Sequence, residues 1–355
     1  MSNALGGSIV IAQKKLKRGR PDTKHPAGRR PKETPTAIKF EPRPASTDRH
    51  DQFEVVADGL GRYTIDISLP AGHDREEARY PVVMVVDGNL LFDAAQVALH
   101  GRFMSAGGLL PPSILVGVGY PADEGMASFY ARRNYDFHGP WAMTDPLGLS
   151  LHGYFNMMKT AEGKPDMEMR AGGYERFMGF LRDELLPSLA ARYPIDLKAR
   201  HALIGDSSGG HFVLRALYDP ASPFRRYVCI SPGFGSAEGA IQRAEAEYAA
   251  AHDDLDADLF ICCGRVEIDQ EPVMAMLRFG SGVTWIAEQF AIRGWRSARI
   301  DWEIMNHEDH GSIQLRAVAA GLRSVHRLRP GVDEAEVKMA QAAMREALGA
   351  IAGKR

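Results

Sequence analysis

The sequence predicts an α/β fold in which a mostly parallel central sheet carries helices on both faces. Six runs of apolar residues lack polar alternation, which is typical of strands that are covered on both faces. Stretches with helical periodicity lie between most of these runs, and this alternation requires crossover connections between parallel strands. The chain has 355 residues, of which 45% are hydrophobic, so it can bury a sizeable core.

The predicted elements follow one another from residue 53, within a domain that we assign to residues 48–330. Residues 53–57 and 63–69 flank the turn formers of residues 58–61 and predict an antiparallel hairpin. The buried strands are predicted at residues 81–86, 114–119, 201–205, 227–230, 259–263 and 298–304. Helices are predicted at residues 90–99, 174–191, 209–217, 237–251, 272–289 and 312–327.

Residues 120–172 interrupt this alternation. They contain no clear strand, many loop formers and a Met-rich stretch. Long irregular segments in compact domains are usually functional covers or binding loops. We therefore expect a lid-like insertion over a pocket, with a simple excursion over the surface as the alternative.

The two ends of the chain differ in composition from the domain. Residues 1–47 are rich in Lys, Arg and Pro, which predicts a disordered tail, and residues 331–355 predict a terminal amphipathic helix. Residues 1–46 carry eleven basic and three acidic residues, although the formal net charge of the whole chain is −2. Residues 18–21 match the core of an AT-hook, a DNA-binding tetrapeptide. A solvated linker is the favoured interpretation, because such short motifs arise easily by chance.

The cysteines and the hydropathy pattern indicate the cellular compartment in which we expect the protein. Cys229, Cys262 and Cys263 all lie in predicted strands, where thiols usually act as small buried hydrophobes. No window approaches the roughly 18 to 20 apolar residues of a membrane span. The basic cluster follows the apolar residues 5–12, whereas a signal peptide has the reverse order. We therefore expect a cytoplasmic protein with no membrane partner.

The strongest local signal for chemistry is Gly-Asp-Ser-Ser-Gly-Gly at residues 205–210. It follows a predicted strand and precedes a predicted helix, which is the setting of a nucleophile elbow in an α/β-hydrolase fold. Small flanking residues are needed there because the serine occupies a strained backbone conformation. Ser207 is the predicted nucleophile. Ser208 is expected to supply a backbone N–H to the oxyanion hole at the helix N-terminus.

The predicted base is His310. In this fold the nucleophile, the acid and the histidine follow one another along the chain. His310 lies in a polar loop between the last predicted strand and the last core helix, where the fold presents its imidazole. His307 in the same loop is the alternative, and His211 is interpreted as a packing residue.

The loop after residues 259–263 offers three carboxylates, Glu267, Asp269 and Glu271. The acid accepts the imidazole N–H, selects the tautomer and stabilises the imidazolium. Glu267 is favoured and Asp269 comes next, while Glu271 suits the N-terminus of a helix. A Ser-His dyad without an acid also remains open.

The second oxyanion donor is expected from the loop that follows residues 82–86. Gly88 and Asn89 are the candidates, since a glycine lets a backbone N–H approach the reacting carbonyl. An ordinary Asp-Gly turn is the alternative.

Several motifs, taken in order, resemble the esterase family of esterase D and the enterochelin (ferric-siderophore) esterases. The resemblance covers roughly residues 60–327. It rests on residues 83–92, 116–121, 133–137, 172–177, 184–187, 205–210, 224–232 and 308–313. It implies an α/β-hydrolase that hydrolyses esters, with Ser207 and His310 at the matching catalytic positions and residues 87–89 as the oxyanion loop.

The sequence also departs from this family. Its elbow reads Gly-Asp-Ser-Ser-Gly where the family commonly has Gly-His-Ser-Tyr-Gly or Gly-His-Ser-Leu-Gly, and Phe-His-Gly-Pro at residues 137–140 replaces a motif that ends in Thr-Pro. These differences leave the ester chemistry intact but weaken the expectation of a siderophore substrate.

The sequence thus predicts a serine esterase that acts on a small-molecule ester without a cofactor or a metal. The alternatives are a siderophore-type esterase and a hydrolase-fold protein whose basic tail binds nucleic acid. The identity of the ester, and whether identical chains associate, do not follow from the sequence.

Overall fold

A sheet of eight strands forms the centre of the described chain, in the order β1-β2-β4-β3-β5-β6-β7-β8. This computed structural model describes residues 50–70, 73–74, 76–100, 110–234 and 239–327, with eight further residues between 333 and 345. The predicted tail at residues 1–47 lies outside the described residues, as does most of the predicted helix at residues 331–355.

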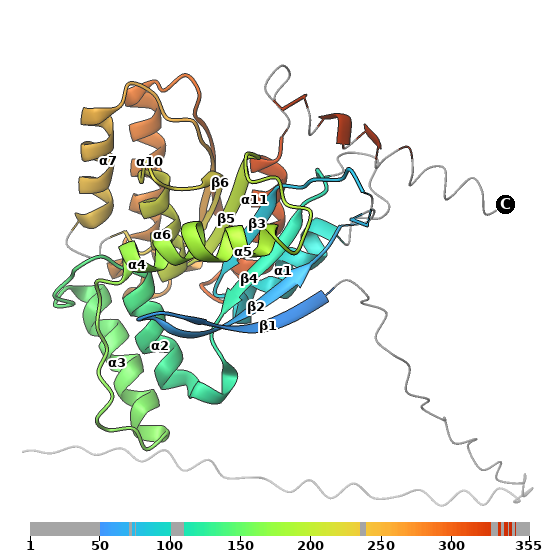
Figure 1. The fold of residues 1–355 in the computed structure, drawn as a ribbon. Helices are drawn as coiled ribbons and strands as arrows, with labels where there is room; N and C mark the ends of the chain where they lie inside the picture. The colour runs from blue at the N-terminus through green and yellow to red at the C-terminus, as the bar shows by residue number, and fades with distance from the viewer. Residues whose placement is uncertain are drawn as a thin grey trace, which may run out of the picture. The chain divides into compact units, whose positions relative to one another are not determined.

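The sheet is antiparallel at one side and parallel elsewhere, as Figure 1 shows. The predicted hairpin is confirmed as β1 (His50–Ala57) and β2 (Gly61–Ser68), and β2 runs antiparallel to β4 (Ile114–Gly119). The remaining neighbours are parallel, which places the carboxyl ends of their strands at one edge. These strands are β3 (Val82–Val86), β5 (His201–Asp206), β6 (Phe224–Ile230), β7 (Asp258–Gly264) and β8 (Arg299–Met305).

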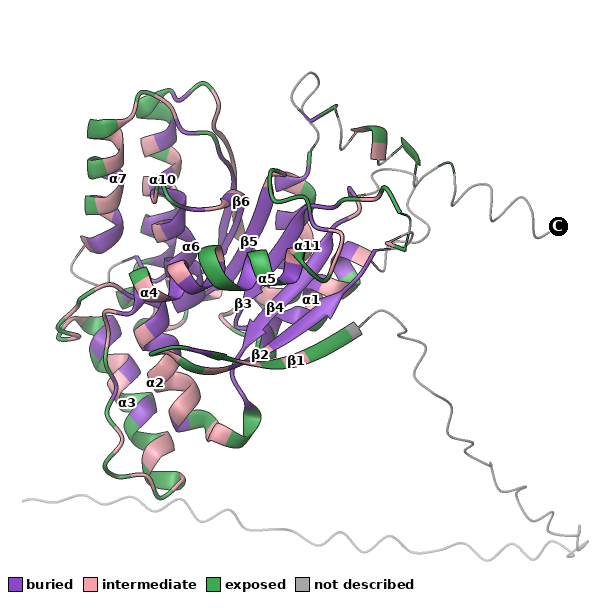
Figure 2. Ribbon diagram, viewed as in Figure 1, coloured by how far each residue is buried: buried purple, intermediate pink, exposed green. Residues whose placement is uncertain are grey.

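Helices cover both faces of the sheet, and the central strands are buried along their length in Figure 2. Successive residues of a strand point to opposite faces, so Val83 and Val85 belong to one apolar cluster and Met84 to the other. The cluster of Val83 is completed by α1 (Gly88–His100) and α11 (Ile313–Val325). The opposite cluster includes side chains of α6 (Ser208–Leu217) and α10 (Phe279–Arg293).

Two predicted helices have an internal interruption. The helix predicted at residues 174–191 consists of α4 (Tyr174–Gly179), the π-helical η2 (Phe180–Leu185) and α5 (Leu186–Ala190). The helix predicted at residues 272–289 was wrong as a single element. It consists of α9 (Pro272–Met276) and α10, because Arg278 adopts a left-handed conformation with φ 59° between them. The helix predicted at residues 237–251 is present as α7 (Ala240–Ala251).

Residues 120–172 contain more regular structure than the sequence indicated. A short 3-10 turn, η1 (Ala122–Glu124), leads into α2 (Gly125–Phe137), and α3 (Pro146–Ala161) follows. The helical pattern of α2 is hidden because it buries the polar side chains of Arg133, Asn134 and Asp136. A buried polar side chain breaks the apolar periodicity by which a helix is usually detected. The role of this segment as a lid stays a prediction.

Cys229, Cys262 and Cys263 are free thiols buried in β6 and β7. Within the described ranges, none of the helices combines the length and the apolar character that crossing a membrane requires.

Candidate active site

Ser207 occupies a sharp turn between β5 and α6. Its backbone has φ 60° and ψ −117°, a conformation that is strained for any residue with a side chain. The motif glycines make room for this turn. A Cβ atom at Gly205 would collide with the carbonyl group of Gly209, and one at Gly209 would come within 3.2 Å of Asp87 Oδ2. The predicted elbow is therefore present, with Ser207 at its apex.

The backbone of Ser207 is held on both sides while its hydroxyl group is left free. Its N–H donates to the carbonyl of Ile230 at 2.9 Å, and its carbonyl accepts the N–H of His211 at 3.0 Å. Within the described part of the chain, the Ser207 hydroxyl group makes no hydrogen bond. Catalytic hydrogen bonds are often long before substrate binds, so this geometry is compatible with a nucleophile awaiting its base.

The predicted base and one of the predicted acids lie in direct contact. The Nδ1 atom of His310 lies 2.5 Å from Oε1 of Glu267, a side chain with no exposed surface. The other Glu267 oxygen accepts hydrogen bonds from Ser231 Oγ at 2.8 Å and from the N–H of Gly264 at 2.5 Å. The ring of Phe279 stacks on the imidazole with a centroid distance of 5.3 Å. His310 is thus fixed with Nε2 free to act as the basic nitrogen.

The two other carboxylates of this loop do not reach the histidine. Glu267 lies within the short helix α8 (Val266–Asp269), whose position brings it under the imidazole. Asp269 is exposed and forms an ion pair with Arg265 at 3.0 Å. Glu271 is the residue that precedes α9. Of the three predicted candidates, only Glu267 is hydrogen-bonded to His310.

The alternative histidines are placed differently. His307 is exposed, at a backbone φ of 65°. His211 is buried one helical turn after Ser207, where its Nδ1 faces the carbonyl of Gly233. Burial lowers the pKa of His211 to about 4, which leaves it a neutral packing residue near pH 7.

Asp206, the residue before the nucleophile, is a second carboxylate at this site that the sequence reasoning did not single out. It is buried, and its Oδ2 accepts a hydrogen bond from Gln314 Nε2 at 2.8 Å. Burial raises the pKa of Asp206 to about 6, and the positive charge of a protonated His310 partly opposes this shift. Gln314 lies in α11, four residues after His310, so this hydrogen bond connects the start of α11 with the residue before the nucleophile.

The pKa of His310 is raised by its two carboxylate neighbours. Burial alone would lower this pKa, but the hydrogen bond to Glu267 and the charge of Asp206 outweigh that effect. The arrangement can therefore hold the positive charge that an imidazole acquires when it removes a proton from Ser207.

The loop expected to complete the oxyanion hole follows β3. Asp87 has a positive φ of 54°, and Gly88 is the first residue of α1. The side chain of Asn89 both donates to the Tyr120 carbonyl at 2.8 Å and accepts the Tyr120 N–H at 2.6 Å. The first N–H groups of a helix have no partner within it, so those of Gly88 and Asn89 in α1, and that of Ser208 in α6, are candidate donors to an oxyanion.

Arg133 links this loop to the elbow. Its buried side chain donates from Nε to Asp87 Oδ2 at 2.8 Å and from Nη2 to the carbonyl oxygen of Asp206 at 3.0 Å. Burial raises the pKa of the Asp87 carboxyl, an effect that the charge of Arg133 opposes. Sequence reasoning noted Arg133 only as part of a family motif and missed this positioning role. The sequence offered no clear signal for this role, because the helical pattern of α2 is hidden by its buried polar side chains.

Asp136 belongs to the same motif and connects α2 to the sheet through hydrogen bonds. Its Oδ2 accepts hydrogen bonds from Tyr63 Oη at 2.7 Å and from Tyr120 Oη at 3.0 Å. The guanidinium of Arg132 lies over both rings, 4.7 and 5.1 Å from their centroids. Burial raises the pKa of Asp136 to about 7. The Arg133 contacts are thus supported by a second buried polar cluster on α2.

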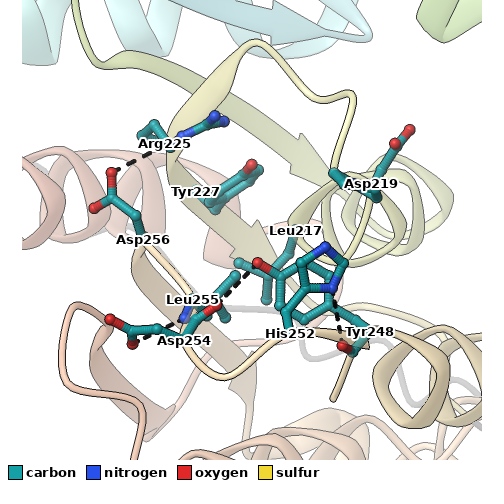
Figure 3. A pocket seen from close by; sticks show the side chains of 10 residues that line it. Leu217, Asp219, Arg225, Tyr227, Tyr248, His252, Asp254, Leu255 and Asp256 are labelled. Atoms are coloured by element: carbon teal, nitrogen blue, oxygen red, sulfur yellow. Dashed lines mark hydrogen bonds and ion pairs between the residues drawn. The ribbon is translucent and has the colours of Figure 1, made fainter. Parts of the chain in front are cut away.

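The pocket in Figure 3 lies at the other edge of the sheet from Ser207. It is a hollow of about 340 Å³, and its lining includes Arg225 and Tyr227 near the start of β6 and Asp256 just before β7. Since β5, β6 and β7 are parallel, these residues are opposite the edge at which β5 ends. No serine, threonine, cysteine or lysine is among the described residues that line it.

Within the described ranges, no group of three or more His, Cys, Asp or Glu side chains is arranged to hold a metal ion.

Parts of this chain are similar in sequence to known proteins. Residues 157–295 match the family described as Putative esterase. The siderophore triacetylfusarinine C esterase of Aspergillus fumigatus is 30% identical over 197 residues, which are 54% of this chain and 58% of that protein. The ferri-bacillibactin esterase BesA of Bacillus subtilis is 26% identical over 263 residues, 74% of this chain and 83% of that protein. The match therefore spans less than two thirds of the fungal relative.

Solved structures are similar over most of the described fold. The siderophore hydrolase EstA from Aspergillus nidulans superposes with a TM-score of 0.66 at 22% identity, covering 81% of this chain and 97% of that one. The BES protein from Bacillus cereus gives a TM-score of 0.64 at 22% identity, covering 82% and 100%. These likenesses show the α/β-hydrolase fold. The chain is thus similar to the Putative esterase family over residues 157–295, and to curated siderophore esterases over 54% to 74% of its length.

Proposed function

We propose that this protein is a serine esterase that hydrolyses carboxylic esters through an acyl-enzyme. The observation that carries the proposal is the hydrogen bond between His310 and the fully buried Glu267, in a fold whose elbow holds Ser207 in a strained conformation. Ser207 is the nucleophile, His310 the general base and Glu267 the acid of the triad.

Each step of the reaction has a residue to perform it. His310 accepts the Ser207 proton through Nε2 while Oγ attacks the ester carbonyl carbon. The N–H groups of Ser208 and of Gly88 or Asn89 donate to the oxyanion that forms. His310 then protonates the leaving alcohol. Water, activated by the same imidazole, next attacks the acyl-enzyme and releases the carboxylic acid.

The test is hydrolysis of p-nitrophenyl acetate by a Ser207→Ala variant. We expect kcat to fall by about 10⁴- to 10⁶-fold, as expected when the nucleophile of a serine hydrolase is removed. A Ser208→Ala variant is the matched control, because Ser208 contributes only its backbone N–H, which alanine retains. Parental activity of Ser207→Ala would show that another residue is the nucleophile.

A siderophore ester is the second candidate substrate. The curated relatives in Aspergillus fumigatus and Bacillus subtilis are named as esterases of triacetylfusarinine C and of ferri-bacillibactin. The altered elbow and the replaced Thr-Pro motif weigh against carrying that specificity over to this chain. Incubation of the protein with a cyclic siderophore ester, followed by chromatography, distinguishes a siderophore esterase from an esterase of other esters. Release of hydroxy-acid fragments supports the siderophore substrate.

We also propose a cytoplasmic location. Three free, buried cysteines support it, because unpaired thiols are common where the environment is reducing. Cell fractionation with a soluble cytoplasmic marker tests it, and recovery with extracellular or envelope fractions would refute it.

A further inference from the structure

Helix α3 has two apolar faces, of which the fold of the domain uses only one. Leu147, Leu151 and Phe155 are buried against the body of the domain. A second stripe repeats every three or four residues along the helix and faces outward. It consists of Pro146, Leu149, Ser150, Gly153, Tyr154 and Met157. A surface helix normally carries polar side chains on its outer face, so this stripe needs another explanation.

The outward stripe forms one wall of an apolar groove. The groove has a volume of about 590 Å³, and its other wall is Val273 and Met276 of α9. Leu149, Met157 and Met276 are each more than half exposed. Among the described residues that line the groove, none is Asp, Glu, Lys or Arg. The groove is therefore suited to an uncharged, apolar ligand.

The α9 wall is joined directly to the base and its acid. The short helix α8 contains Glu267, α9 follows it, and Phe279 begins the next helix. Glu267 is hydrogen-bonded to His310, and Phe279 stacks on the same imidazole. The segment that carries Val273 and Met276 is thus anchored at both ends on the histidine.

The α3 wall leads to the nucleophile. Asp145 caps α3 and accepts a hydrogen bond from Trp141 Nε1 at 3.0 Å. The Trp141 ring contacts His138, with 5.0 Å between centroids, and His138 contacts His211 at 4.9 Å. The N–H of His211 donates to the carbonyl of Ser207. An unbroken series of contacts therefore connects the start of α3 with the elbow.

We propose that this groove binds the acyl chain of the ester substrate, and that the enzyme prefers extended apolar acyl groups to acetyl. This inference rests on the proposed esterase function and adds the substrate class. An acyl chain is the occupant favoured by the geometry, because the α9 wall lies between two residues that contact the His310 imidazole, and the start of the α3 wall is connected to Ser207 through a series of contacts. Each methylene group that the groove covers is expected to raise kcat/KM by about fourfold.

The experiment compares kcat/KM for p-nitrophenyl octanoate and p-nitrophenyl acetate. We expect octanoate to be preferred by the parent protein by at least about 50-fold, a preference that three covered methylene groups would supply. Leu149→Glu and Met276→Glu place a charge on either wall and should lower the octanoate-to-acetate ratio at least tenfold. Ile292→Glu on α10 is the matched control, because Ile292 is equally apolar and exposed but does not line the groove, and its ratio should be parental.

The proposal would be overturned if both wall variants had the parental octanoate-to-acetate ratio of kcat/KM. It would also be overturned if the parent protein preferred acetate. A binding measurement separates this failure from failure of the esterase function. Calorimetric titration of Ser207→Ala with p-nitrophenyl octanoate requires no turnover. Binding that Leu149→Glu weakens supports the groove even if no ester is hydrolysed, and binding that Leu149→Glu leaves unchanged refutes it.

Discussion

Arg133 and Asp87 form a buried ion pair, with Nε and Oδ2 2.8 Å apart. Both side chains are at least nine-tenths buried, so neither charge is compensated by water. Through Nη2, the same guanidinium also holds the backbone of Asp206. One side chain therefore links the loop that carries Gly88 to the elbow that carries Ser207, the two segments that contain the proposed oxyanion donors.

We predict that Arg133→Met lowers the free energy of unfolding by about 3 to 5 kcal/mol, because it leaves the Asp87 carboxylate buried without a partner. Adding Asp87→Asn should recover part of this loss, since the uncompensated charge is then removed. Urea denaturation of the two single variants and the double variant measures the coupling.

Arg170→Met is the control for this cycle. Arg170 and Glu168 form an ion pair at 3.1 Å whose side chains are 75% and 72% exposed. Exposed pairs contribute about 0 to 1 kcal/mol, so this variant should unfold almost as the parent protein does. Additive losses in the Arg133 and Asp87 variants would show that the buried pair is not coupled.

The acid of the proposed triad can be tested by Glu267→Gln. The amide retains the size of the side chain but removes the charge that stabilises the imidazolium and selects its tautomer. We expect kcat to fall by about 10²- to 10⁴-fold. Asp269→Asn serves as the control, because Asp269 is exposed and pairs with Arg265. Equal losses in the two variants would contradict the assignment of Glu267.

Asp206 should influence the pH dependence of the reaction. The base must be neutral to accept a proton, so the acid limb of the kcat/KM profile follows the pKa of His310. This pKa is raised by Glu267 and by Asp206. Asp206→Asn removes one of these charges, and the midpoint of the acid limb should therefore move to lower pH.

The charged groups that interact electrostatically with His310 are Glu267, Asp206, Arg133 and Asp309. An Asp183→Asn variant controls for a general change of surface charge, because the Asp183 side chain is 58% exposed and is paired with Arg182. A profile of Asp206→Asn that is displaced to higher pH, or not displaced, would refute the proposed influence.

Asp136 should make the fold less stable as the pH rises. Its pKa is raised to about 7 in the folded protein, from about 3.9 in an unfolded chain. The folded state therefore binds more protons than the unfolded state between these values. Its stabilising contribution is complete below about pH 4 and is lost as the pH rises toward 7. Asp136→Asn removes this titration.

We accordingly expect the stability of Asp136→Asn, relative to the parent protein, to increase from pH 4 to pH 8. Chemical denaturation at a series of pH values measures this difference, in which titration of the buried histidines cancels. A difference that is constant over this range would show that Asp136 is ionised throughout.

Local patterns in the sequence were sufficient for the sheet, the hairpin and the elbow. A strand covered on both faces is recognised by its continuous apolar run, and the turn at Ser207 by the small residues that it requires on both sides. These are constraints between chain neighbours, so they can be read along the chain. The order of motifs then indicated His310 as the partner of Ser207.

The tertiary structure decided what depends on side chains far apart in the chain. Glu267, Asp269 and Glu271 are equivalent as neighbours in sequence, and only the position of α8 brings one of them to His310. The sequence likewise could not place Asp206 beside His310, because the fold alone joins β5 to the loop after β8. The buried polar residues of α2 concealed that helix, since its periodicity shows only once Asp87, Tyr63 and Tyr120 are known to be their partners. The sequence by itself therefore determined the fold and the position of the elbow that carries the proposed nucleophile. The selection of the acid, and the groove beside it, required the packing of distant segments, because hydrogen bonds and burial are set by distances in space.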